Sequence, residues 1–154
     1  MLDLDDLLAG LTPKERAAVE ELDARRLEVE RSGLGPSAAA TLTAPLHGVF
    51  ARLRMWNGLV RDMENLWAAR DHCSVHEYLH LLEARDGIER NSQRMPARLR
   101  RKFENVVGEL DRRFREMTDD DGGAELSRYS RKVAAGIELS WWWTRKPKVL
   151  PAGW

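Results

Sequence analysis

Apolar residues recur every three or four positions over two long stretches of this chain, which is the spacing of one face of an α-helix. The first stretch predicts a helix over residues 45–71, and the second predicts a helix over residues 96–118. No stretch alternates strictly between apolar and polar residues, so we predict no β-strand. The helical positions are Leu46, Val49, Phe50, Leu53, Trp56, Val60, Met63 and Trp67, followed by Leu99, Phe103, Val106, Val107, Leu110, Phe114 and Met117.

A third helix is predicted by signals at its two ends rather than by a strong apolar face. Thr12 and Glu15 have the spacing of a capping box, and Pro13 stands at the first helical position between them. Gly33 is a typical stop signal. This helix is therefore expected to run from Pro13 to about Arg31.

Two more helices follow from local patterns. Ser74 and Glu77 form a second capping-box pair, which predicts a helix that starts at Ser74. The aspartates and glycines of residues 119–123 then break the chain after the helix at 96–118. The last predicted helix carries Leu126, Tyr129, Val133 and Ile137.

These elements predict an all-α fold. We expect a single domain over residues 1–154, a bundle of four to five helices with an irregular, tryptophan-rich tail at about residues 140–154. Its 154 residues include 43% hydrophobic and 32% charged side chains, which is typical of a globular protein with one core.

The two ends of the chain differ in charge although the net charge is zero. Residues 1–40 carry 5 basic and 9 acidic side chains, a balance of −4, and residues 122–154 carry 6 basic and 2 acidic ones, a balance of +4. A dedicated DNA-binding domain has a stronger basic excess. This difference in charge favours contact between the two ends of the chain, or an acidic partner that binds the C-terminal end.

Cysteine use and the start of the chain bear on the compartment. Cys73 is the only cysteine, which excludes a disulfide within the chain and fits a reducing compartment. The start of the chain, M-L-D-L-D-D-L-L, is acidic where a secretory signal is basic. No apolar run reaches the roughly 18 residues of a membrane span. We therefore predict a cytoplasmic protein without a membrane span.

One short motif has the residue types and spacing of a metal centre. Two histidines four apart lie one turn above the other on a helix, where both can bind one zinc ion. The motif is His76-Glu77-Tyr78-Leu79-His80, with the uncharged flanking residues Ser74, Val75, Leu81 and Leu82. It resembles the zincin metallopeptidases. That resemblance implies a zinc-dependent hydrolase in which His76 and His80 bind the metal and Glu77 is the catalytic proton shuttle.

The same residues also fit an ordinary helix start. Glu77 would then cap the helix with Ser74, and His76 and His80 would flank a buried face. The metzincin continuation of the motif needs a glycine and a histidine where this chain has Glu83 and Asp86. This interpretation predicts no cofactor, with bound zinc as the alternative.

The C-terminal tail holds four of the six tryptophans beside basic residues. Tryptophan and arginine dominate the hot spots of protein interfaces, so the tail is the predicted partner-binding segment. Alternatively, it wraps over the helices and seals their end. The predicted partner-binding residues are Trp141, Trp142, Trp143, Arg145, Lys146 and Trp154.

A basic cluster opens the helix at 96–118, the end where the helix dipole favours acidic residues. It suggests phosphate contacts through Arg94, Arg98, Arg101 and Lys102. A solvated face, paired with nearby acidic residues, is the alternative.

No complete catalytic arrangement is present in the sequence. We therefore expect a non-enzymatic helical interaction or regulatory protein, such as an adaptor or an immunity-type partner, that binds another protein. The first alternative is the zinc-dependent hydrolase, and the second is a nucleic-acid-associated protein.

Overall fold

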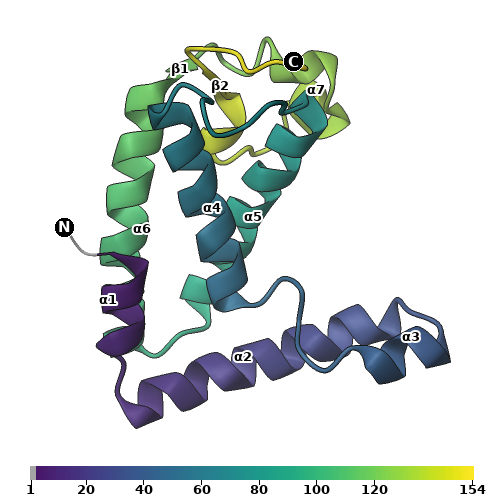
Figure 1. Ribbon diagram of the computed structural model, residues 1–154, viewed down its shortest axis with the longest axis vertical. Helices are drawn as coiled ribbons and strands as arrows, with labels where there is room; N and C mark the ends of the chain where they lie inside the picture. The colour runs from purple at the N-terminus through teal and green to yellow at the C-terminus, as the bar shows by residue number, and fades with distance from the viewer. Residues whose placement is uncertain (1–2) are drawn as a thin grey trace. The chain divides into compact units, whose positions relative to one another are not determined.

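The computed structural model describes residues 3–154, which are mostly helical (Figure 1). The predicted all-α fold with an irregular, tryptophan-rich C-terminal region is confirmed. In chain order the elements are α1 (Leu4–Ala9), α2 (Pro13–Ser32), α3 (Pro36–Thr41), α4 (Val49–Glu64), α5 (Val75–Gln93), α6 (Ala97–Met117), β1 (Thr118–Asp120), the 3-10 helix η1 (Leu126–Arg128), α7 (Arg131–Ala135), the 3-10 helix η2 (Trp141–Thr144) and β2 (Arg145–Pro147).

The described residues form two compact units. The first unit comprises the chain up to Arg54 together with Gly87–Val107, and the second comprises Met55–Asp86 together with Gly108–Trp154. Helices α4, α5 and α6 each contribute a segment to both units. The single domain over residues 1–154 stays a prediction.

In the first unit, α2 forms as its end signals predict. The Thr12 hydroxyl accepts a hydrogen bond from the Glu15 amide at 3.2 Å, and the Glu15 carboxylate accepts one from the Thr12 amide at 2.9 Å. Lys102 also donates to Glu15 at 2.8 Å, and this bond lowers the pKa of the Glu15 carboxyl. Only the N-terminal half of α2 is buried, through Glu15, Val19 and Leu22.

Helix α4 starts later than predicted, because acidic side chains of α2 cap its start. The Leu46 and His47 amides donate to the Glu30 carboxylate at 2.8 and 2.9 Å. The Val49 amide donates to Asp23 at 2.8 Å. These bonds hold the chain before Val49 in a non-helical path, and the predicted start at residue 45 is wrong.

The predicted end of this helix at residue 71 is also wrong. Leu66 and Trp67 have φ angles of 52° and 62°, in the left-handed region that L-residues rarely adopt. The Trp67 amide donates to the Asp62 carbonyl at 2.7 Å, and the Leu66 amide donates to Met63 at 3.0 Å. This pair of bonds is a Schellman motif, with a leucine where glycine is usual, and it ends α4 at Glu64.

The helix predicted at 96–118 is confirmed by α6. Most residues of the two predicted apolar faces are buried, but Leu46 is 66% exposed, and Phe50 and Met117 are half-buried. Phe103 and Val106 are buried in the first unit, and Trp56, Val60 and Leu110 are buried in the second. The Trp56 and Phe114 rings lie 4.5 Å apart between centroids. Aromatic pairs at this distance contribute beyond the area that they bury.

The second unit contains two elements that the hydrophobic pattern misses. Strand β1 pairs antiparallel with β2, with Asp119 opposite Lys146, so the prediction of no strand is wrong. The predicted helix through Tyr129 and Ile137 is also wrong, since η1 and α7 are separate and Ile137 is 74% exposed. Gly136, with φ of 64°, ends α7.

Candidate functional site

The His76-Glu77-x-x-His80 motif lies in the first turns of α5, where the predicted capping box is present. The Ser74 amide donates to the Glu77 carboxylate at 2.7 Å, and the Glu77 amide donates to the Ser74 hydroxyl at 3.2 Å. Val75, Tyr78 and Leu82 form the buried face. Glu77 therefore stabilises the start of the helix.

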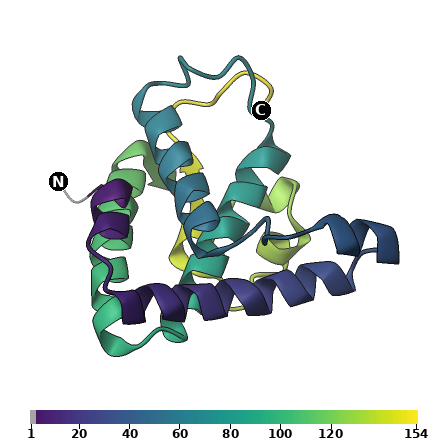
Figure 2. The ribbon, with the colours of Figure 1, turned by 60° about the horizontal axis from the view of Figure 1, so that its bottom comes forward.

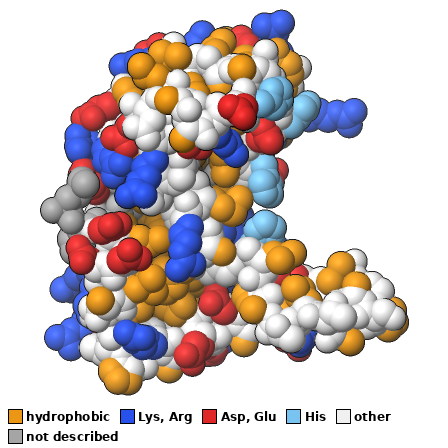
Figure 3. Space-filling model, viewed as in Figure 1, with side chains coloured by type: hydrophobic (Ala, Val, Ile, Leu, Met, Phe, Trp, Pro, Cys, Tyr) orange, Lys and Arg blue, Asp and Glu red, His pale blue; other side chains and the backbone are white. Residues whose placement is uncertain are grey.

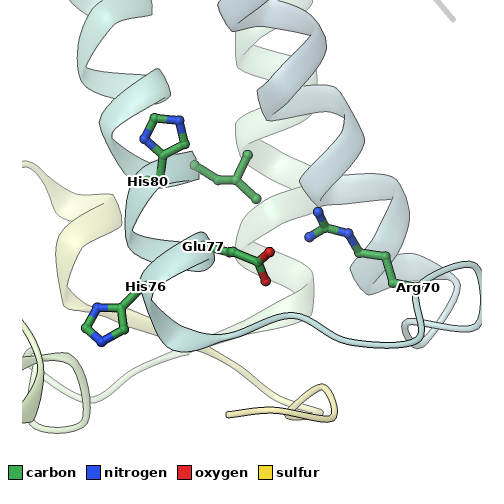
Figure 4. Close-up of a pocket in the computed structure, with 5 residues that line it drawn as sticks. Arg70, His76, Glu77 and His80 are labelled. Carbon is green, nitrogen blue, oxygen red and sulfur yellow. The ribbon is translucent and has the colours of Figure 1, made fainter.

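His76, Glu77 and His80 are all exposed to solvent. Together with Arg70 and Leu81 they line an open cleft of about 420 Å³ (Figure 4). Figure 4 shows Glu77 directed toward Arg70, and His76 and His80 one turn apart along α5. The predicted metal ligands thus lie on one accessible part of the helix.

Among residues 3–154, no three histidine, cysteine, aspartate or glutamate side chains come together in a geometry that could hold a metal ion. Cys73, next to the motif, is fully buried, and burial raises the pKa of its thiol. The Arg70 guanidinium donates to the Cys73 sulfur at 3.3 Å. The third protein ligand of a zincin centre is therefore not found in the described part of the chain, and the hydrolase stays a prediction.

The tail of residues 140–154 packs into the second unit. Trp142 and Trp143 are 3% and 2% exposed. Both indole N–H groups donate to the same oxygen of Asp86, at 2.9 Å each, and Lys132 donates to its other oxygen at 3.0 Å. Asp86 therefore provides the polar partner that two buried indoles need.

A buried ion pair supports the same region. Arg85 donates twice to Asp111, at 3.0 and 2.8 Å, and Trp56 donates to Asp111 at 3.1 Å. The Arg85 guanidinium lies 4.3 Å from the centroid of the Trp142 ring. One charge network thus links the helices to the tail.

The other predicted partner-binding residues are half-buried. Trp141 lies under the Arg115 guanidinium at 3.7 Å, and Trp154 packs edge-on against Tyr78 at 5.1 Å. Arg145 donates to the Thr118 hydroxyl at 2.8 Å, and Lys146 lies in β2. These contacts integrate the tail into the second unit, while binding of a partner by these residues stays a prediction.

The basic cluster of the first unit divides into two groups. Lys102 donates to Glu15 and to the Gly10 carbonyl, so it stabilises the packing of the unit. Arg94, Arg98 and Arg101 are exposed. Contact of these residues with nucleic acid stays a prediction.

Sequence reasoning missed one surface feature of the first unit, residues 32–46, which we call the arm. The arm has the sequence S-G-L-G-P-S-A-A-A-T-L-T-A-P-L, contains no charged residue, and none of its residues is buried. Leu34 and Leu46 are 44% and 66% exposed. The absence of charge over fifteen residues was the available signal, in a chain that is 32% charged.

Within the arm, α3 lies beside the C-terminal half of α2 (Figures 1 and 2). On the face shown in Figure 3, the end of the arm consists mostly of hydrophobic and uncharged atoms. Large exposed apolar side chains on this segment are Leu34 and Leu46, and exposed apolar surface is a common feature of interaction sites in proteins.

Comparisons of this chain with protein-family models, with curated proteins and with solved structures find no match. No helix among residues 3–154 is long and apolar enough to cross a membrane.

Proposed function

We propose that this chain is a non-enzymatic protein-interaction module, of the adaptor or immunity type, and that the arm binds its partner. The observation that carries this proposal is that the arm is apolar, uncharged and uncovered. An ordinary surface segment of this length would contain several charged residues. Binding a partner would remove Leu34 and Leu46 from water.

Side chains of α2 anchor the backbone of the arm. The Arg31 guanidinium donates to the Leu42 carbonyl at 2.9 and 2.6 Å, and Glu30 holds the Leu46 and His47 amides. Both anchors come from α2. A preorganised arm loses less conformational entropy on binding than a flexible one, which favours affinity.

The composition of the arm specifies the chemistry of the partner. An uncharged surface offers no ion pair, so the matching surface on the partner protein is apolar. Association through the arm should depend little on salt concentration, because no charge pair is screened. A nucleic acid would require the opposite, a steep loss of affinity with salt.

Site-specific photo-crosslinking in the producing cells tests this proposal. A photoreactive residue at Leu34 or Leu46 should give a discrete protein adduct, and one at exposed Arg131 in the second unit should not. Charges introduced by Ala38→Asp with Ala40→Asp should abolish the adduct and leave the free energy of unfolding within about 0.5 kcal/mol, since both residues are exposed.

Each outcome of the crosslinking has a defined meaning. An adduct of twice the mass of the chain identifies the apolar partner as a second copy. Loss of the adduct on nuclease treatment identifies nucleic acid and contradicts the proposal. Equal adducts at Leu34 and Arg131, or none at the arm, also contradict it.

A further inference from the structure

The exposed histidines of α5 have a geometry that the proposed interaction function does not use. His76 and His80 are four residues apart on a helix of 19 residues, so their side chains project about 40° apart with a rise of about 6 Å between them. Both line the open cleft at the start of α5 (Figure 4). Two imidazoles in this relation can bind one metal ion without any change of the backbone.

A neighbouring carboxylate lies beside one of the two rings. His80 Nδ1 lies 3.6 Å from a Glu83 carboxylate oxygen, one turn further along the helix. Nε2, on the other side of the ring, faces away from Glu83. Carboxylates beside the histidine ligands of metals hold the ring in place and raise its basicity.

The charges around the cleft favour a cation. Arg70 is the basic residue that lines it, and its guanidinium Nε lies 3.3 Å from the Asp62 carboxylate. Glu77 lines the cleft and Glu83 adjoins His80. One positive charge and three carboxylates give a local balance of −2, which attracts a divalent ion.

We propose that His76 and His80 bind one divalent late transition-metal ion through two imidazole nitrogens, with Glu83 as the positioning residue. The protein supplies two ligands and water supplies the others, so the ion exchanges readily. The affinity should follow the order of imidazole complexes, with Cu²⁺ above Ni²⁺ and Zn²⁺, and Mg²⁺ should not bind. The proposal concerns metal binding alone, and Glu77 keeps its place as the capping residue of the helix.

Titration calorimetry on the metal-free, full-length chain without a histidine tag tests this inference. CuCl₂ should bind with one equivalent at the site, and either His76→Ala or His80→Ala should weaken this binding at least about tenfold. His72 is the control, because it lies four residues before His76 but outside α5. His72→Ala should leave the affinity unchanged, and Glu83→Gln should lower it about tenfold.

A thermal measurement provides a second readout. A ligand that binds only the folded chain raises its melting temperature, so Cu²⁺, Ni²⁺ and Zn²⁺ should raise it in the unaltered chain but not in His80→Ala. Copper that binds equally well to both alanine variants reports an adventitious site elsewhere and overturns the inference. A larger loss in His72→Ala than in His80→Ala overturns it as well. If the metal site is disproved, the proposed interaction through the arm is unaffected, because none of these residues belongs to the arm.

Discussion

The C-terminal tail and the arm are both rich in apolar residues, yet the structure treats them in opposite ways. The tail has the larger side chains and buries them, with Trp142 and Trp143 almost inaccessible. The arm has mainly small and aliphatic side chains and buries none of them. A tryptophan-rich segment is therefore not a binding surface by composition alone, and a plain alanine-rich segment can be the exposed one.

The difference follows from the polar partners that each segment finds. The indoles of the tail need acceptors, and Asp86 supplies one oxygen to both. The arm is held at its backbone by Arg31 and Glu30, so its side chains are not needed for its position. Burial of the tail stabilises the second unit, whereas the arm has no buried residue.

The largest expected effect is the loss of a tail tryptophan. Trp142→Ala should lower the free energy of unfolding by about 3–5 kcal/mol, because it removes a fully packed ring. Leu34→Ala in the arm should change it by less than about 0.5 kcal/mol. Denaturant unfolding followed by circular dichroism measures both. Similar losses in the two variants would remove the distinction between tail and arm.

A somewhat smaller effect is expected when the shared acceptor is lost. Asp86→Ala leaves two buried indole N–H groups without a partner, which should cost about 2–4 kcal/mol. Asp119→Ala, at an exposed position of β1, is the matched control and should be nearly neutral. If the two variants unfold at the same denaturant concentration, Asp86 does not anchor the tail.

The next largest loss of stability is expected from a substitution of the glycine near the end of the tail. Gly153 has φ of +93°, and a Cβ there would lie 1.9 Å from the ring of His72. Gly153→Ala should therefore destabilise by about 2 kcal/mol. Gly58→Ala is the control, since a Cβ at this position of α4 meets no atom within 4 Å. Gly58→Ala should stabilise the helix by about 0.5–1 kcal/mol. A rise in the free energy of unfolding for Gly153→Ala would mean that the end of the tail does not pack on His72.

The smallest effect concerns the anchor of the arm and depends on pH. Burial tends to raise the pKa of Glu30, but its hydrogen bonds from Leu46, His47 and Arg26 outweigh this, and the net pKa is lowered from 4.5. Because the pKa of Glu30 is lower in the folded chain than in the unfolded chain, its ionised carboxylate stabilises the fold at pH values above the unfolded pKa. This contribution is lost as the pH falls through the folded pKa. Glu30→Gln should thus cost about 1 kcal/mol at pH 7 and less below pH 4.

The matched control for this pH effect is Glu28→Gln, at an exposed position of the same helix. Unfolding free energies from pH 7 to pH 3 should converge for the unaltered chain and Glu30→Gln. A constant difference over that range would show that the charge of Glu30 does not hold the arm.

Much of the fold is local and could be predicted. Both capping boxes form, and the apolar stripe of α6 has its expected length, because these signals depend on residues within one or two turns. The errors are nonlocal. Asp23 and Glu30 cap α4 from 16 to 26 residues away in the chain, and each strand of the β1–β2 pair is only three residues long.

The site could be predicted only in part for the same reason. The histidine spacing is a helical property, so the sequence places His76 and His80 on one exposed part of α5. The direction of the tail tryptophans depends instead on Asp86, more than 50 residues earlier. The end of α4 depends on Leu66 in a left-handed conformation, which no pattern of apolar residues encodes.

Hydroxyl-radical footprinting of the purified chain measures side-chain exposure in the tail and the arm in one experiment. We expect Trp142 and Trp143 to be modified much more slowly than in the unfolded chain, and Leu34 and Leu46 to be modified at nearly their unfolded rates. Rapid modification of the two tryptophans together with protection of the two leucines would contradict the buried tail and the exposed arm.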